Sequence, residues 1–217
     1  PLGEHLLVEL AAVLRDEVTT TDELIPSGET SSYRSNPLRL AEFTLSRREP
    51  AYVGRAKAAA ALEAQRRDGK APQRLREILD KVGDGAALLE DTQFGSCVFA
   101  NRPGDGSARE QAASCQKVLG GLANICYEFA TKRYRSNCIN WGMLPFLVKD
   151  PAVLDNGDYV YLPGVRKALL NADDELTAIA VKPDGGLVQF TVKLGAMTDA
   201  ERRILADGCL INYYKNN

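Results

Sequence analysis

The turn before Ser107 is the part of this sequence best placed to do chemistry. Residues 102–106 form a short turn with two glycines, and the segment that begins at Ser107 is expected to be a helix. The first backbone N–H groups of a helix have no partners within the helix and lie at the positive end of its dipole, so they bind anions readily. Ser107 is therefore a candidate residue of an anion site.

A purely structural explanation of Ser107 is also open. Serine is a favoured N-cap residue, and Glu110 stands three residues later, as a capping box requires. From the residues of the turn alone the cap is the favoured explanation, and the anion site needs further evidence.

The segments around this turn indicate an α/β protein. Residues 94–100 and 122–129 read as buried strands, and a short helix is expected through 135–141. Because these strands alternate with helices, we expect them to pair in parallel through crossover connections. Three short β-rich segments follow, at 158–162, 176–181 and 187–192. A turn at 184–186 joins the last two, which predicts a hairpin. A capping pattern at 198–201 predicts a final helix.

The first third of the chain is less uniform. Leucine and valine spacing in 5–14 fits a helix at least as well as a strand. Residues 19–36 are dense in Thr, Ser, Gly and Pro, which predicts a polar loop. Residues 51–81 are rich in Ala, Arg, Lys and Leu, which predicts two helices with a break near 68–72. The positive charge of this pair is typical of a solvated helix face.

Composition indicates a single soluble domain over residues 1–217. Its hydrophobic fraction of 45% and charged fraction of 26% are ordinary, and no apolar run is long enough to cross a membrane. With 27 basic and 29 acidic residues the charge is nearly balanced, which argues against a nucleic-acid partner. Neither a signal peptide nor a transit peptide follows Pro1, so we expect a cytoplasmic protein whose chain begins partway into a longer one.

The cysteines support that location. Five of them are spread along the chain without the close pairs of zinc sites or the clusters of disulfide scaffolds: Cys97, Cys115, Cys126, Cys138 and Cys209. We expect reduced and mostly buried thiols.

Three motifs together resemble the aconitases and isopropylmalate isomerases. Residues 106–113, Gly-Ser-Ala-Arg-Glu-Gln-Ala-Ala, resemble the Gly-Ser-Ser-Arg-Glu-x-Ala-Ala motif of that family. Residues 21–25 resemble its Thr-Asp-x-Ile loop. Residues 135–137, leading to Gly-Met-Leu-Pro at 142–145, resemble its Arg-Ser-Asn segment and the Gly-x-Leu-Pro that follows. Three motifs in the family's order are far more specific than any one of them.

The resemblance implies a fold. It is that of the carboxy-terminal swivel domain of aconitases, an α/β fold in which helices flank a mixed, barrel-like sheet. It makes 5–14 a strand, against the helical spacing of its leucines. The helical hairpin at 51–81 has no obvious counterpart in ordinary aconitases, and we expect it to be an insertion packed outside the barrel.

The resemblance also implies roles for five residues. Ser107 would be the catalytic base, which takes a proton from the carbon next to a substrate carboxylate. Arg34 and Arg109 would bind substrate carboxylates, because a planar guanidinium offers two parallel hydrogen bonds. Asp22 would orient a histidine of the cluster-bearing domain, although a polar turn explains it equally well. Ala108 stands where the family has a second serine, so one hydroxyl contact with the substrate is absent.

The implied activity is that of a lyase, a hydratase or isomerase of a small hydroxy di- or tricarboxylic acid. Such hydro-lyases use a 4Fe-4S cluster held by three cysteines, and the cysteines here lack the close spacing. We therefore expect no cofactor in this chain and a cluster in missing domains of the same polypeptide or of a partner subunit, without which the chain is inactive.

Two alternatives stay open. The chain could be the separate small subunit of an enzyme like isopropylmalate isomerase, or a non-catalytic binding or regulatory module that retains the fold. Ala108 is the main support for the module. In each case we expect a carboxylate-binding protein without nucleic-acid or membrane partners.

Overall fold

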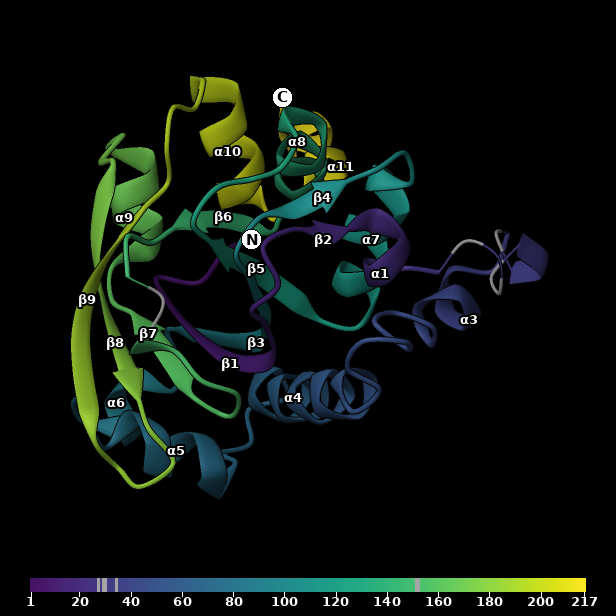
Figure 1. Ribbon diagram of the computed structural model, residues 1–217. Coiled ribbons are helices and arrows are strands. Elements are labelled where there is room, and N and C mark those ends of the chain that lie inside the picture. The colour runs from purple at the N-terminus through teal and green to yellow at the C-terminus, as the bar shows by residue number, and fades with distance from the viewer. Residues whose placement is uncertain (27, 29–30, 34, 151–152) are drawn as a thin grey trace.

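A closed barrel organises the computed structural model, which describes residues 1–26, 28, 31–33, 35–150 and 153–217. Within those residues seven strands form the barrel in the order β1-β3-β5-β6-β9-β8-β7 (Figure 1). Their bounds are β1 His5–Leu14, β3 Thr92–Ala100, β5 Gly121–Cys126, β6 Leu144–Leu147, β7 Tyr159–Leu162, β8 Glu175–Val181 and β9 Leu187–Lys193. The mixed, barrel-like sheet predicted from the family resemblance is confirmed.

Parallel and antiparallel pairs divide the barrel into two halves. β1, β3, β5 and β6 pair in parallel, whereas β7, β8 and β9 join the sheet through antiparallel pairs. The predicted crossover pairing and the predicted hairpin are both confirmed. Because the carboxyl ends of parallel strands meet at one edge, the segments that follow β1 and β3 leave the barrel on the same side.

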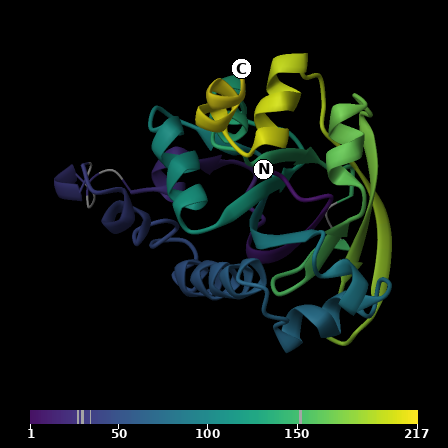
Figure 2. The same ribbon diagram turned by 180° about the vertical axis from the view of Figure 1, so that it is seen from behind.

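Helices surround the barrel. The longer ones are α4 Tyr52–Arg67, α5 Gln73–Leu79, α7 Arg109–Val118, α8 Lys132–Asn140, α9 Val165–Leu170, α10 Asp199–Asp207 and α11 Leu210–Asn216. The shorter ones are α1 Thr21–Leu24, α3 Pro37–Ala41, α6 Gly85–Leu88 and the 3-10 turn η1 Ser31–Tyr33. α10 and α11 lie on the opposite side of the molecule from α4 and α5 (Figures 1 and 2). None of the described helices is both long and apolar enough to cross a membrane.

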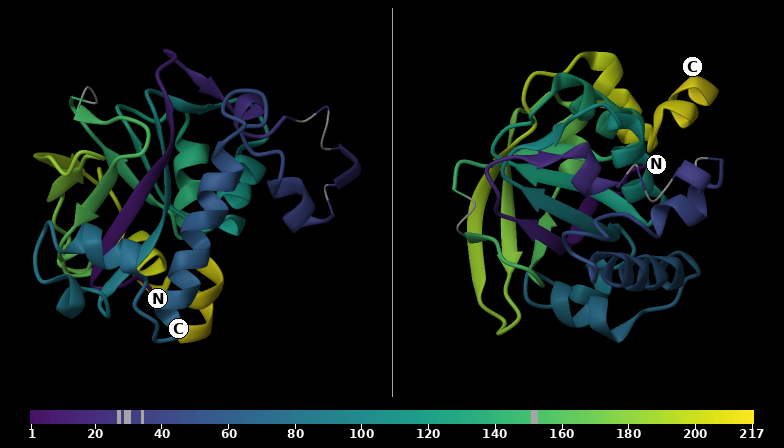
Figure 3. Two further views of the ribbon diagram at one scale, coloured as in Figure 1. Left: turned by 90° about the horizontal axis from the view of Figure 1, so that it is seen from below. Right: turned by 45° about the vertical axis from the view of Figure 1, so that its right-hand side comes forward.

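The chain ends lie on one side of the molecule in both views of Figure 3. The amide of Leu2 donates to the carbonyl of Ala206 over 3.0 Å, which attaches the amino-terminal segment to α10. α10 begins with the predicted capping box, which Thr198 and Glu201 form. Gly208, at a φ of 104°, then ends it, so the predicted final helix is two helices, α10 and α11.

Burial explains why the leucine spacing of β1 misleads. Seven of its ten residues are buried, because one side of the strand faces the barrel interior and the other lies under packed helices. A strand buried on both sides loses the alternation of apolar and polar residues that marks a half-exposed strand. The strand implied by the resemblance is confirmed, and the helical interpretation is wrong.

Two other expectations are refined by the fold. The predicted helices within 51–81 are confirmed as α4 and α5, and α4 packs on the outside of β1 and β3. The segment 19–36 is not a simple loop, because it contains β2 (Thr19–Thr20), α1 and η1. β2 pairs in parallel with β4 (Pro103–Asp105), which occupies most of the predicted glycine turn.

Candidate functional site

The small ribbon of β2 and β4 brings two of the motifs together. Thr20 pairs with Asp105, so α1 and the turn before Ser107 start from neighbouring positions (Figure 1). Gly106 has a φ of 131°, and a Cβ built on it would lie 2.3 Å from Thr21 Oγ1. Only glycine allows the turn to approach α1 so closely. The Thr-Asp segment and the Gly-Ser segment therefore form one local structure.

Ser107 is not a helix cap. α7 begins at Arg109, its N-cap is Ala108, and no side chain caps it. The predicted capping box of Ser107 and Glu110 is wrong, because pairing of β4 as far as Asp105 and the turn at Gly106 move the N-cap one residue later, to Ala108. Ser107 is exposed, and its hydroxyl makes no hydrogen bond within the part of the chain that the structure describes.

A hollow of about 470 Å³ lies beside this turn, along the outer face of α7 and against α3. We call it the α7 hollow. Its lining includes Ser107, Ala108 and Arg109 at one end and Val118 and Trp141 at the other. Arg109 makes no ion pair or hydrogen bond with any described residue, and its Nε is buried without a partner. A buried N–H without an acceptor is costly, so an anion in this hollow would satisfy it.

Of the other two predicted site residues, only Asp22 is described by the structure, and it does not line the hollow. Asp22 is exposed in the first turn of α1, where its Oδ2 lies 3.5 Å from Arg47 Nη1. That ion pair agrees with a surface role but does not test the orienting role implied by the resemblance. Arg34 lies outside the described residues, so the predicted approach of Arg34 to Ser107 stays a prediction.

The third motif closes the domain. Arg135 Nη2 donates to the carbonyls of Leu194 and Ala196, over 3.1 and 2.9 Å, which joins α8 to the segment between β9 and α10. Gly142 abuts the backbone at Gly208, whose carbonyl oxygen would lie 1.6 Å from a Cβ at Gly142. Both contacts are structural.

A buried triangle of hydrogen bonds, which could not be seen in the sequence, lies next to the turn before Ser107. The Tyr134 hydroxyl donates to Asn124 Oδ1 over 2.6 Å and accepts from Gln116 Nε2 over 2.8 Å. Asn124 Nδ2 donates to Gln116 Oε1 over 2.8 Å and completes the triangle. The Tyr134 side chain also covers Gly104, leaving no room for a Cβ there. The triangle joins α7, β5 and α8, and its only sequence signal is an asparagine within an apolar strand.

Replacing Tyr134 with phenylalanine is expected to lower the free energy of unfolding by about 1 to 3 kcal/mol, because Asn124 and Gln116 would each lose a buried partner. Burial raises the pKa of Tyr134, so the wild-type hydroxyl keeps the proton that it donates. Urea unfolding monitored by circular dichroism measures the change. The matched variant Tyr127→Phe, at an exposed tyrosine, should unfold like the wild type. Equal stability of Tyr134→Phe and wild type would contradict the role of the triangle.

The thiols do not fit an iron-sulfur cluster. Cys209 is half-buried, and the other four cysteines are buried: Cys97, Cys115, Cys126 and Cys138. None of the five forms a disulfide. Burial raises the pKa of Cys115 to about 11 and that of Cys138 to about 12, whereas cluster ligands are thiolates. Among the described residues no group of three or more His, Cys, Asp or Glu side chains could hold a metal ion.

Comparison with known proteins gives relatives of one kind. No family model matches the chain. It is 33% identical over 135 residues to the methanogen homoaconitase small subunit of Methanocaldococcus jannaschii, covering 62% of this chain and 65% of that protein. It is 36% identical over 85 residues to the mitochondrial aconitate hydratase of Gracilaria gracilis, covering 38% of this chain and 10% of that protein.

A solved structure agrees in fold. The crystal structure of 3-isopropylmalate dehydratase from Methanocaldococcus jannaschii superimposes with a TM-score of 0.54 and 20% sequence identity, over 98% of this chain and 94% of that one. The chain therefore spans 65% and 10% of the two curated relatives that it matches, and nearly all of the solved chain. In sequence the chain is thus similar to a homoaconitase small subunit and to part of an aconitate hydratase, and in fold it is similar to the solved 3-isopropylmalate dehydratase.

Proposed function

We propose that this chain is the swivel-type unit of a hydro-lyase that acts on a small hydroxy di- or tricarboxylic acid. One observation carries the proposal: Ser107, whose hydroxyl caps no helix, lines the same hollow as Arg109, whose guanidinium has no partner among the described residues. Ser107 would be the base and Arg109 a substrate-carboxylate ligand. Both stand at the start of α7, where backbone N–H groups face outward.

The chemistry asked of Ser107 depends on its surroundings. A hydroxyl is a weak base near neutral pH, so an alkoxide at Ser107 must be stabilised by N–H donors and positive charge in a site shielded from water. The start of α7 and Arg109 can supply the donors and the charge. Shielding is missing on this chain alone, because Ser107 is exposed. We infer that a second body closes over the hollow, and that the chain is inactive without it.

That second body would also hold any 4Fe-4S cluster, because the buried thiols here do not fit one. The two curated relatives represent two ways to supply it. The homoaconitase relative is a small subunit, whereas the matched segment of the aconitate hydratase is a small part of a much longer chain. In our proposal Arg34 binds a second carboxylate of the substrate, and Asp22 orients a histidine of the second body.

Replacing Arg109 with lysine tests this function. We expect kcat/KM of the assembled enzyme to fall by about 10- to 100-fold, mainly through a higher KM, because lysine keeps the charge but loses the paired hydrogen bonds to a carboxylate. The measurement is dehydration of hydroxy di- and tricarboxylic acids by the chain assembled with a cluster-bearing partner. The control is Arg76→Lys, at an exposed position of α5. Unchanged kinetics in Arg109→Lys would remove Arg109 from the substrate site.

A non-catalytic module is the second candidate, favoured by Ala108. Ala108 is the N-cap of α7. The family motif that residues 106–113 resemble has a serine at this position, so the α7 hollow lacks one hydroxyl. A module would bind carboxylates in the assembled protein and lose that binding in Arg109→Lys, yet turn over none of them. Turnover by the wild type therefore separates the enzyme from the module.

A further inference from the structure

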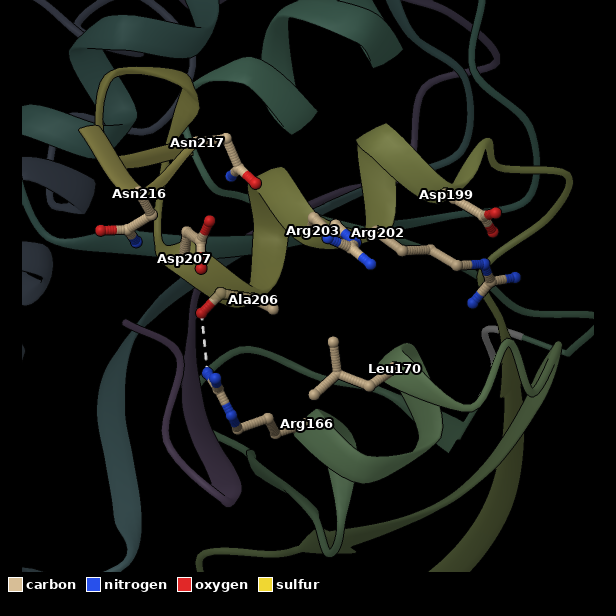
Figure 4. Close-up of a pocket in the computed structure, with 9 residues that line it drawn as sticks. All are labelled: Arg166, Leu170, Asp199, Arg202, Arg203, Ala206, Asp207, Asn216 and Asn217. Carbon is tan, nitrogen blue, oxygen red and sulfur yellow. Dashed lines mark hydrogen bonds between the residues drawn. The ribbon is translucent and has the colours of Figure 1, made fainter. Parts of the chain in front are cut away.

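A second hollow, of about 500 Å³, lies between α9, α10 and α11 (Figure 4). We call it the C-terminal hollow. Three arginines line it, together with two acids, two amides and two apolar residues: Arg166, Arg202, Arg203, Asp199, Asp207, Asn216, Asn217, Leu170 and Ala206. It shares no lining residue with the α7 hollow.

Arg166 and Arg202 join α9 and α10 through hydrogen bonds to backbone carbonyls, and we call this pair the arginine clamp. Arg166, on α9, donates from Nη1 to the carbonyl of Ala206 near the end of α10, over 2.8 Å (Figure 4). Arg202, on α10, donates from Nη1 to the carbonyl of Leu169 near the end of α9, over 3.2 Å. Each guanidinium thus satisfies a carbonyl in the last turn of the other helix. The clamp holds both guanidinium groups in position before any ligand arrives.

The charges in the hollow are not paired. Within the described residues, Arg166, Arg202 and Arg203 form no salt bridge, and the carboxylates of Asp199 and Asp207 stay beyond ion-pair distance of them. Arg202 is only 7% exposed. A buried guanidinium without a carboxylate is unfavourable, because charges that leave water are usually paired. The arrangement leaves a place for an anion.

The clamp leaves donors available for such an anion. An arginine has five N–H donors, and within the described residues Arg166 and Arg202 donate hydrogen bonds from Nη1 alone. Their other nitrogens have no partner among the described residues and are not fully buried, so they are available to a ligand. Arg203 is exposed and adds a third guanidinium from α10. Donors thus approach from two sides, α9 and α10.

We propose that the C-terminal hollow binds a small phosphate-bearing molecule. The tetrahedrally arranged oxygens of a phosphate can accept from donors on several sides at once, whereas a carboxylate has only two oxygens, which lie in one plane. A hollow of this size matches the range of small-molecule sites. Leu170 and the amides of Asn216 and Asn217 would contact the remainder of the molecule. This site does not depend on the function proposed for the α7 hollow.

The test is thermal unfolding of the 217-residue chain in inorganic phosphate, compared with chloride at equal ionic strength. A ligand of the folded state raises the unfolding midpoint saturably, by roughly 3 to 6 °C at ten times its Kd. We expect that rise in the wild type and about a tenfold weaker apparent affinity in Arg203→Gln. This substitution should not harm the fold, because Arg203 is exposed and unpaired among the described residues.

Two controls assign the effect to this hollow. Leu170→Ala changes an uncharged lining residue and should keep the saturable rise, and Arg109→Lys, in the α7 hollow, should keep it as well. Non-specific salt stabilisation would rise without saturating and equally in all variants. That result, an unchanged response in Arg203→Gln, or a response lost only in Arg109→Lys would each overturn the proposal.

Discussion

Replacing Ser107 with alanine is expected to lower kcat of the assembled enzyme by roughly 10²- to 10⁴-fold, the usual contribution of a positioned base. The reason is local, since the hydroxyl is removed from the position where α7 and Arg109 would stabilise an alkoxide. Stability should change by less than about 0.5 kcal/mol, as is usual for surface positions, because Ser107 is exposed and caps no helix. Steady-state dehydration kinetics and urea unfolding measure the two quantities.

Ser114→Ala is the matched control for that experiment. Ser114 lines the same hollow but lies further along α7, and its hydroxyl donates to the carbonyl of Gln111. Its kcat should stay within about twofold of the wild type. If both serine variants lost turnover equally, the effect would belong to the hollow as a whole. If neither lost it, Ser107 would not be the base.

Replacing Gly142 with alanine is expected to cost about 3 to 5 kcal/mol of the free energy of unfolding, the largest stability effect that we foresee for a single methyl group. Gly142 has a φ of 82°, and the new Cβ would meet the backbone carbonyl of Gly208 at 1.6 Å. This contact joins the end of α8 to the end of α10, and backbone cannot rotate away as a side chain can. Urea or thermal unfolding measures the loss.

Gly157→Ala separates the two causes of that loss. Gly157 has nearly the same φ, 84°, but apart from its chain neighbours no described residue has an atom within 4 Å of a Cβ built there. It should cost only the strain of a left-handed alanine, about 1 to 2 kcal/mol. Similar losses in both variants would mean that strain alone acts at Gly142, and that the contact with Gly208 is unimportant.

The barrel could largely be predicted from the sequence because its strands are buried and β-rich. β3 is buried along its whole length, and the parallel pairing of β3 with β5 follows from helices that alternate with strands, whereas β6 was not expected from the sequence. β1 could not be assigned from spacing, since burial on both sides removes its alternation. Recognition of the family motifs supplied what the spacing of leucines did not.

The local geometry of the candidate site was beyond the sequence. β2 is two residues long and α1 four, so these elements exist through contacts with β4 and α7 instead of through propensity. The first residue of α7 depends on where β4 ends, and local sequence placed it at the wrong residue. The triangle of Tyr134, Asn124 and Gln116 joins three elements that no short window of sequence contains.

The structure describes some of the candidate site residues more fully than others. The structure places Ser107, Ala108 and Arg109 on one hollow, as their adjacency in the sequence requires. That Ser107 caps no helix and that Arg109 has no partner among the described residues could not be predicted, because both depend on the helix start and on the packing around it. Asp22 lies on the neighbouring α1, and the position of Arg34 stays a prediction.

The most direct test of the account follows the Arg109 side chain during ligand binding. The assembled enzyme would carry isotope-labelled arginine, and the Nε–H signal of Arg109 would be followed as tricarballylate, a tricarboxylate without a hydroxyl to eliminate, is added. We predict a saturable shift of this signal, because its buried donor gains a carboxylate. Saturable inhibition of turnover by tricarballylate without any shift at Arg109 would contradict the account, since the substrate's carboxylates would then bind elsewhere.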